Sequence, residues 1–225
     1  MSNIGLIVAL QTEIPYFLKE NEGVYQTKAH AVKVAVSGIG PQRARRATQQ
    51  MCNGTLGFYP ELLLNLGFCG AVRNDLDIGQ LVIASRLFFR DQEIVPAPAA
   101  IARVVDLLAG TNYRIGKLQM FNWPVLSRSK VSSDTLAVDM ESFAVAHTAA
   151  KYRIPAVHIK AVSDRVPQHV SLRGLLAAIR SLKSGSKIAG RQLNTLAQKM
   201  LDDQWLSDII RVLHLEDAVR KETAP

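Results

Sequence analysis

Short runs of consecutive apolar residues alternate along this chain with longer segments of helical character. Runs that are apolar at nearly every position are typical of strands buried on both faces of a sheet. Apolar residues that recur every three to four positions indicate amphipathic helices. The strand candidates are Ile4–Leu10, Val32–Val36, Leu62–Leu66, Gln80–Ser85, Ile115–Phe121 and Ala156–Val162. The helix candidates are Gln42–Met51, Ile101–Ala109, Leu136–Tyr152, Leu172–Leu182, Lys187–Asp203 and Trp205–Lys221, with a break expected at Gly185 and Ser186.

This alternation of strands and helices predicts an α/β fold with a largely parallel sheet covered on both faces. The length of 225 residues fits one large domain, which we expect to span residues 1–225. The chain shows no internal repeat, low-complexity tract or linker that would divide it.

Composition narrows the class of protein. A hydrophobic fraction of 48% excludes a disordered chain, a collagen or a small cysteine-rich scaffold. The two cysteines, Cys52 and Cys69, lack the spacing of a disulfide framework or a zinc site. No apolar stretch approaches the roughly 18 residues of a membrane span, and the first apolar run is too short for a signal peptide. We therefore expect a cytoplasmic protein.

The net charge is +8, which raises the question of an anionic partner. Seven Lys and Arg residues and no acid lie between Arg165 and Lys199. No nucleic-acid-binding motif accompanies these charges, so we interpret them as solvated helix faces and expect no nucleic-acid partner. Peripheral contact of this basic segment with a membrane is an alternative that we do not favour over packing on the sheet.

Polar or glycine-bearing segments follow several of the predicted strands, where ligands of open α/β sheets bind. Each segment alone has a structural explanation: Glu13 as a first-turn helix acid, Asp164 as a helix cap, and the glycines as turn residues. Their joint placement at one sheet edge favours a site. The segments are Gln11–Glu13, Ser37–Gly40, Asn65–Gly70 and Ser163–Asp164, with Glu141 near a helix start.

Five of these stretches resemble the nucleoside phosphorylase/nucleosidase superfamily, especially its methylthioadenosine/S-adenosylhomocysteine nucleosidase branch. They occur in the family's order and cover most of residues 1–170. The combination of DMES with a strand that ends in AVSD is the most specific feature. The stretches read IGLIVALQTE, VSGIG, LNLGFCGAVRNDLDIGQLVIAS, AVDMESFAVAH and IPAVHIKAVSD.

The resemblance implies a single α/β domain around a twisted mixed sheet flanked by helices, in a dimer or larger oligomer. It implies cleavage of the N-glycosidic bond of a purine nucleoside, with adenine as the expected base. Neither a metal nor an organic cofactor is expected. Acidic groups suit this reaction, because the departing base must be protonated and the ribose develops positive charge.

The family motifs assign roles to individual residues. Asp164 is the expected general acid toward N7 of the departing purine, oriented by Ser163. Glu13 is the expected general base for an attacking water. Met140 and Glu141 are expected to hold the ribose.

Further contacts with the substrate are expected from the neighbouring motif residues Gly67, Phe68 and Lys160. Phe121 or Trp123 is the expected aromatic residue that stacks on the base, although an aromatic residue in this region also suits the core.

Several positions depart from the family pattern. Asn65 and Phe68 stand where the phosphorylase branch has an arginine and a serine that contact phosphate. An amide and a phenyl ring cannot replace those anion ligands, which favours water as the nucleophile. Lys160 replaces an arginine, and Asp139 replaces a glutamate.

Two alternatives stay open at this point. One is phosphorolysis, with phosphate bound in an anion pocket formed by Gly38, Gly40 and Arg43, or by Arg45 or Lys160. Hopanoid-associated members of the superfamily are candidate relatives, because residues 86–133 form a shorter segment than in typical nucleosidases. The other alternative is a non-catalytic protein that binds purine nucleosides on the same fold.

Overall fold

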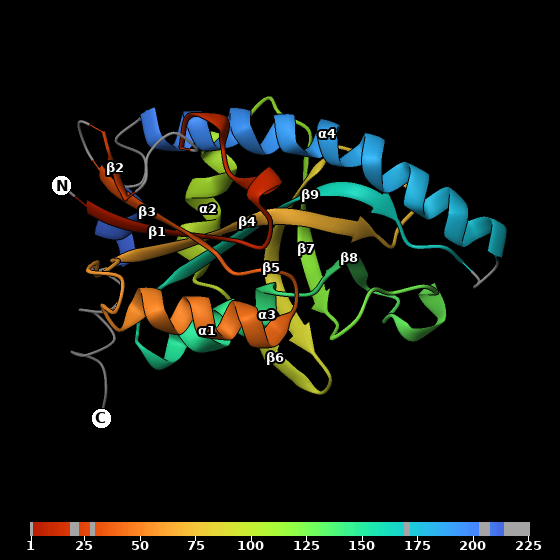
Figure 1. Cartoon of the computed structure of the whole chain (residues 1–225), viewed down its shortest axis with the longest axis horizontal. Helices are drawn as coiled ribbons and strands as arrows, with labels where there is room; N and C mark the ends of the chain where they lie inside the picture. The colour runs from red at the N-terminus through yellow and green to blue at the C-terminus, as the bar shows by residue number, and fades with distance from the viewer. Residues whose placement is uncertain (1, 19–22, 28–29, 169–171, 203–207, 214–225) are drawn as a thin grey trace.

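The computed structural model describes residues 2–18, 23–27, 30–168, 172–202 and 208–213 (Figure 1). This part of the chain contains nine labelled strands and four labelled α-helices. The strands are β1 (Ser2–Val8), β2 (Val24–Gln26), β3 (His30–Val36), β4 (Leu62–Ala71), β5 (Leu81–Phe89), β6 (Gln92–Ile94), β7 (Tyr113–Met120), β8 (Thr135–Asp139) and β9 (Ala156–Arg165). The α-helices are α1 (Pro41–Cys52), α2 (Pro98–Leu107), α3 (Ser142–Lys151) and α4 (Leu172–Asp202). Short 3₁₀-helices are η1 (Gln11–Glu13), η2 (Tyr16–Leu18) and η3 (Arg128–Lys130).

The strands form one mixed sheet, in the order β2-β3-β1-β4-β8-β7-β5-β6, with β9 paired to both β4 and β5. Five pairs are parallel: β1–β3, β1–β4, β4–β9, β5–β7 and β7–β8. Because β9 joins β4 to β5, the pairings β4–β9–β5–β7–β8–β4 close into a ring. The expected mixed sheet flanked by helices is confirmed.

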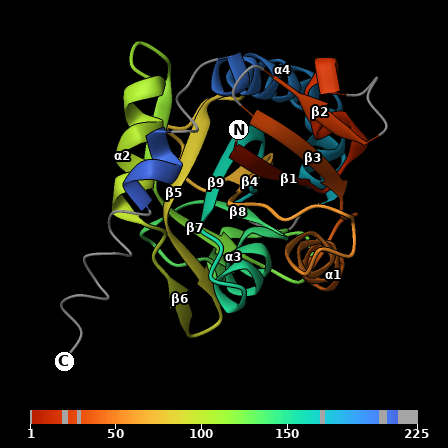
Figure 2. The same cartoon turned by 90° about the vertical axis from the view of Figure 1, so that its left-hand side faces the viewer.

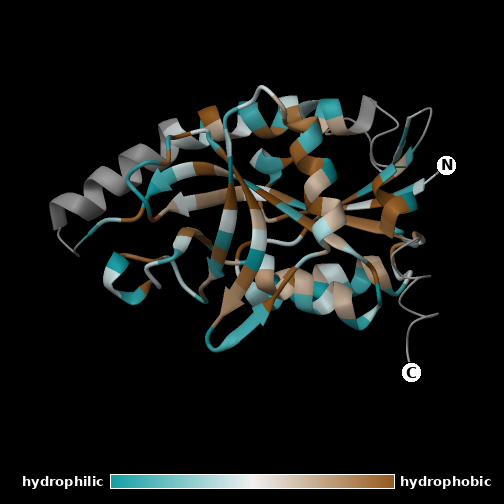
Figure 3. Cartoon of the chain, turned by 180° about the vertical axis from the view of Figure 1, so that it is seen from behind, coloured by the Kyte–Doolittle hydropathy of each residue, from teal (hydrophilic) through white to brown (hydrophobic). Residues whose placement is uncertain are grey.

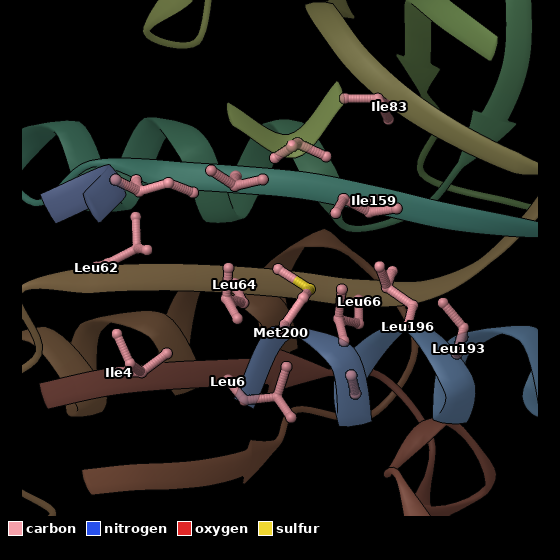
Figure 4. Close-up of a cluster of buried hydrophobic side chains, with 14 of the residues drawn as sticks. Ile4, Leu6, Leu62, Leu64, Leu66, Ile83, Ile159, Leu193, Leu196 and Met200 are labelled. Carbon is pink, nitrogen blue, oxygen red and sulfur yellow. The ribbon is translucent and has the colours of Figure 1, made fainter. Parts of the chain in front are cut away.

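Each face of the sheet carries its own hydrophobic core, because most strands are apolar on both faces. Figure 2 shows α4 on the opposite side of the strands from α1 and α3. One core joins β1, β4 and β9 to α2, α4 and residues 209–213, and Figure 4 shows Leu64 and Leu66 facing Leu196 and Met200 in it. The other core joins the opposite strand faces to α1 and α3. Outside the two cores, the tip of the β5–β6 hairpin is hydrophilic (Figure 3).

Several predicted boundaries were wrong. The helix expected from Leu136 begins only at Ser142, because Thr135–Asp139 forms β8. The break expected at Gly185 does not occur, and α4 runs through it as one helix of 31 residues. The short edge strands β2 and β6 were not predicted.

Of the helix expected over Trp205–Lys221, residues 208–213 are helical and the remainder lies outside the described residues. None of the described helices has the length and apolar character needed to cross a membrane.

Candidate active site

Five segments that carry the expected site residues meet at one edge of the sheet. Glu13 ends η1, directly after β1. Gly67–Gly70 lie in the second half of β4, and Lys160–Asp164 lie in β9, its parallel neighbour. Ser37–Gly40 connect β3 to α1, and Asp139–Ser142 connect β8 to α3. Segments far apart in the sequence therefore form one site.

Glu13 is buried and hydrogen-bonded through both carboxylate oxygens. Its Oε2 accepts the N–H groups of Ala9 at 2.7 Å and Leu10 at 2.8 Å, and its Oε1 accepts that of Phe68 at 2.8 Å. Burial raises the pKa of Glu13, while the charge of Lys160 and these three N–H groups act in the opposite direction. The carboxyl group is thus fixed in position and is a stronger base than an exposed glutamate.

Lys160 brings a buried positive charge to the same side of β4. Its Nζ lies 3.2 Å from Oδ2 of Asp139, and both side chains are 1% exposed. Burial alone lowers the pKa of Lys160, but the carboxylates of Asp139, Glu141 and Glu13 outweigh it and raise that pKa. A Cβ at Gly67 would lie 2.9 Å from Oε1 of Glu13 and 3.1 Å from Nζ of Lys160, so a side chain at this position would have to displace these groups.

Asp139 closes the turn that displays the Met–Glu pair of the DMES motif. Its Oδ2 accepts hydrogen bonds from the Ser142 backbone N–H at 2.9 Å and from the Ser142 hydroxyl at 2.5 Å. Its Oδ1 is buried and has no hydrogen-bond partner among the described residues. The aspartate thereby fixes the backbone of Met140 and Glu141, which lie between the two bonded residues.

Asn65 extends this network into the sheet. Its amide Nδ2 donates to the Ile7 carbonyl at 3.1 Å, which orients the Oδ1 atom toward the Ser142 hydroxyl at 3.1 Å and Nδ1 of His158 at 3.2 Å. Burial, followed by the charge of Lys160, lowers the pKa of His158 to about 3, so its imidazole is neutral and donates from Nδ1. The Asn65 side chain is therefore engaged in structural hydrogen bonds.

Glu141 links the DMES turn to the loop before α1. Its Oε1 accepts the Gly40 N–H at 2.7 Å. Burial, and then the charge of Asp139, raises the pKa of Glu141 to about 7, although Lys160 and the Gly40 N–H oppose the rise. This carboxyl group therefore titrates near neutral pH.

Arg43 lies over the same loop. Gly38 and Gly40 adopt positive φ angles of 81° and 104°, which few other residues tolerate. A Cβ at Gly38 would lie 3.0 Å from Cδ and 3.2 Å from Nη1 of Arg43. The arginine thus folds back over the loop that contacts Glu141.

Asp164 is placed by an irregularity in β9. Cys69 pairs with Val162 and Gly70 pairs with Asp164, so Ser163 is an extra residue and forms a β-bulge. The Ser163 hydroxyl donates to Oδ1 of Asp164 at 2.6 Å and lies 3.3 Å from the Cys69 carbonyl oxygen. Burial raises the pKa of Asp164, and the Ser163 hydroxyl partly opposes this rise. Asp164 is therefore a carboxyl group that is easily protonated.

Of the two aromatic candidates, Phe121 lies beside an acidic residue and Trp123 lies at the surface. The Phe121 N–H donates to the Asp139 carbonyl at 2.9 Å, which places Phe121 next to the DMES turn. Trp123 is 79% exposed. Both line a pocket of about 480 Å³, together with Phe89, Arg90, Gln119, Met120, Asn122, Pro124, Val125, Leu126, Ser127 and Lys130.

Phe68 contributes its backbone to the site. Its N–H binds Glu13, but its ring packs against the core beside α4, where a Cβ at Gly190 would lie 3.9 Å from Cζ. The ring therefore contributes packing on the α4 side rather than a polar contact.

The network of Asn65, His158 and Ser142 was not predicted as part of the site. A signal existed in the sequence, because Asn65 and His158 each interrupt an apolar strand at positions that become paired neighbours. A polar residue inside a buried strand requires a hydrogen-bond partner, and here the two side chains contact one another.

Several known proteins that this chain resembles are named as nucleosidases, and another is named as a futalosine hydrolase. A 5′-methylthioadenosine/S-adenosylhomocysteine nucleosidase of Staphylococcus carnosus (strain TM300) is 27% identical over 230 residues, covering 86% of this chain and 100% of the relative. The enzyme of that name from Neisseria meningitidis, solved with methylthio-immucillin-A, has a TM-score of 0.76 at 19% identity, covering 90% of this chain and 99% of its own. The native futalosine hydrolase of Helicobacter pylori strain 26695 has a TM-score of 0.74 at 18% identity, covering 89% and 97%.

The family itself is identified by sequence. The profile described as the phosphorylase superfamily matches residues 3–183, which is most of the chain and includes every segment of the candidate site. The chain therefore belongs to the phosphorylase superfamily.

Proposed function

We propose that this protein hydrolyses the N-glycosidic bond of an adenine nucleoside and releases the base. The observation that carries the proposal is the environment of Asp164, a partly buried carboxyl group at a strand end whose pKa is raised and whose one described hydrogen-bond donor is Ser163. A protonated carboxyl group in this position suits the task of a general acid. The nucleosidases named above act on substrates of this class, which supports the assignment.

The proposed reaction uses three carboxyl groups. Asp164 donates its proton to the departing purine while the bond between the base and C1′ of the ribose breaks. Glu141 accepts hydrogen bonds from the ribose hydroxyls and holds the sugar as it gains positive charge. Glu13 takes a proton from a water molecule whose oxygen bonds to C1′. The products are the free base and the ribose with a new hydroxyl group at C1′.

Lys160 has a supporting role in this scheme. It lies among Glu13, Asp139 and Glu141, so it limits the repulsion between the carboxylates that the reaction requires. Its pairing with Asp139 leaves little net positive charge to oppose an oxocarbenium-like ribose. Phe121, whose N–H binds the Asp139 carbonyl, is the proposed stacking residue for the base.

Phosphorolysis is the second candidate, and the position of Arg43 favours it. The guanidinium group lies beside Gly38. Gly38 belongs to the same loop as Gly40, whose N–H binds Glu141. Against it, the Asn65 amide is engaged with Ile7, Ser142 and His158, so it is not available to bind an anion. Hydrolysis is therefore our preferred reaction.

The test is adenine release, followed by chromatography, from adenosine, methylthioadenosine, S-adenosylhomocysteine and a lipid-linked adenosine. Each substrate is incubated with and without inorganic phosphate. We expect release that does not depend on phosphate, and the best substrate identifies the 5′ substituent. Release that requires phosphate would replace hydrolysis by phosphorolysis. Binding without release would indicate a nucleoside-binding protein.

We also propose that the protein is a homodimer, as the resemblance implies. Exposed apolar side chains such as Trp123 and Leu126, at 79% and 47% exposure, supply surface that a second copy could bury. Sedimentation equilibrium at micromolar concentration measures the mass of the assembly, and a mass of 24.7 kDa at every concentration would contradict the dimer.

A further inference from the structure

The long helix α4 packs against β9 (Figure 1), and its Gly185 contacts Ser163, the residue before the proposed acid. Gly185 is buried at this contact, and a Cβ built on it would overlap the carbonyl oxygen of Ser163. The same Cβ would lie 2.9 Å from the Ser163 carbonyl carbon and 3.3 Å from Cγ2 of Ile78. The helix backbone therefore rests on the strand backbone with no side chain between them.

The strand residue under this contact is the bulge residue. The residue before it, Val162, is held by two hydrogen bonds to the turn before β5, from Gly79 N–H at 2.8 Å and to the Gln80 carbonyl at 3.0 Å. The residue after it, Asp164, pairs with Gly70. Ser163 lies between these two fixed points, and its carbonyl oxygen faces α4. A bulge has no opposing residue to fix it, so an external contact decides its conformation.

We propose that Gly185 is a positioning residue for Asp164, because it lets α4 hold the Ser163 bulge in the conformation that directs the acid into the site. This inference rests on the proposed function of Asp164 as the general acid. Any side chain at position 185 pushes the helix away from β9 or moves the bulge. Either movement displaces a carboxyl group that must lie within hydrogen-bond distance of the departing base.

The helix supplies a matched control. Gly190 lies five residues, or about 1.4 turns, further along α4 and also faces the site segments. Among the described residues, a Cβ there would meet only the Thr12 carbonyl oxygen at 3.7 Å and the Phe68 ring at 3.9 Å. These are ordinary contact distances. Gly185→Ala and Gly190→Ala both replace glycine by the best helix former, so they share the same propensity effect and differ in the overlap with Ser163.

We expect Gly185→Ala to lower kcat by about 10- to 100-fold with a smaller change in KM, since a displacement of roughly 1 Å costs up to about 10²-fold. Gly190→Ala should keep kcat within about twofold. Asp164 acts in its protonated form, so activity is lost as the pH rises through its pKa. If Gly185→Ala moves the carboxyl group toward solvent, its pKa falls and this alkaline limb moves to lower pH. A Gly185→Ala protein with the kcat and alkaline limb of the parent would overturn the proposal.

Two further measurements keep the proposal testable. If Gly185→Ala does not fold, Ile78→Ala loosens the same contact without overlap, and we expect a smaller loss of kcat in the same direction; an unchanged kcat would count against the proposal. The pKa of Asp164 is also read directly by NMR titration of its ¹³C-labelled carboxyl group. If the parent protein releases no base, the proposed function fails. The titration still decides whether Gly185 positions Asp164, because the pKa of Asp164 must then fall in Gly185→Ala and stay unchanged in Gly190→Ala.

Discussion

The carboxyl groups on the two sides of the candidate active site share one effect and differ in the groups that oppose it. Burial raises the pKa values of Glu13 and Glu141, while the ammonium group of Lys160 and several backbone N–H groups act in the opposite direction. Burial also raises the pKa of Asp164, and there the opposing contact is one hydroxyl group from Ser163. The difference between the two sides is therefore the opposing partner, an ammonium charge on one side and a neutral hydroxyl group on the other, so we expect the two sides to respond to different substitutions.

The largest expected effect comes from removing the acid. Asp164→Asn keeps the size of the side chain but cannot supply the same proton, so we expect kcat for adenine release to fall by about 10²- to 10⁴-fold with little change in KM. Asp106→Asn on the exposed side of α2 is the control, since its side chain is 68% exposed. Retention of more than a tenth of the parent kcat in Asp164→Asn would remove this residue from its assigned role.

Removing the charge on the other side should affect stability most. Lys160→Met leaves Asp139 buried without its ammonium partner, and loss of one member of such a pair costs about 3–5 kcal/mol of unfolding free energy. Lys117→Met is the matched control, because Lys117 is also buried but its partner Asp134 is 49% exposed, and we expect about 1 kcal/mol there. Urea unfolding measures both. Equal losses would mean that the burial of Asp139 does not distinguish the two pairs.

Protonation of Glu141 should weaken substrate binding at acid pH. Its pKa is raised to about 7, so the carboxylate that accepts the ribose hydroxyls is lost as the pH falls through neutrality. We expect KM to rise below about pH 7 in the parent protein, and to be higher but independent of pH between 6 and 8 in Glu141→Gln. Steady-state kinetics across this range test the assignment, and a KM that is flat in the parent protein would contradict it.

Ser163→Ala sharpens the comparison from the acid side. The Ser163 hydroxyl stabilises the ionised form of Asp164, so its removal should raise the pKa of that carboxyl group further. Activity should then persist to higher pH, by about one pH unit, in line with one hydrogen bond to a charged group. This shift is opposite in sign to that expected for Gly185→Ala. If the alkaline limb of the pH–activity profile instead moves to lower pH in Ser163→Ala, the Ser163 hydroxyl acts mainly by positioning the carboxyl group of Asp164.

The smallest effect is expected at Arg43. If water is the nucleophile, Arg43→Gln should change kcat/KM for adenosine by less than about twofold. The measurement is repeated with added phosphate, because a phosphorylase that uses Arg43 to bind the anion would lose its phosphate-dependent activity in this variant. Arg46→Gln on the same helix, at an exposed position with no assigned role, controls for the loss of positive charge.

Much of the site could be predicted from the sequence because it lies where strands end. The rule that ligands gather at the carboxyl ends of strands placed Glu13, Gly38 and Asp164 together, and the structure brings these segments to one edge. The network of Asn65, His158 and Ser142 was missed, since Asn65 and His158 become neighbours only through the pairing of β4 with β9, and Ser142 reaches them from the start of α3. Strand pairing between distant segments is a tertiary event that local patterns do not encode.

The errors in the predicted secondary structure have related causes. Leu136–Asp139 was merged with the following helix because its apolar residues also suit a helical pattern, and β8 is defined by its hydrogen bonds to β7 and β4. A helix break was expected at Gly185 because glycine costs about 1 kcal/mol in a helix. Contact with β9 requires the missing side chain at that position, so the helix continues through it.

The closed ring of strands has a consequence for the order of synthesis. β4 and β5 leave the ribosome long before β9, which joins them and carries Lys160 and Asp164. Until residue 165 has emerged, one edge of β4 lacks its eventual neighbour, and open apolar strand edges are prone to pair with other chains. The nascent protein therefore gains Asp164 and its protection from aggregation in the same late step, when β9 joins the sheet. We expect a chain truncated before β9 to aggregate rather than to be weakly active.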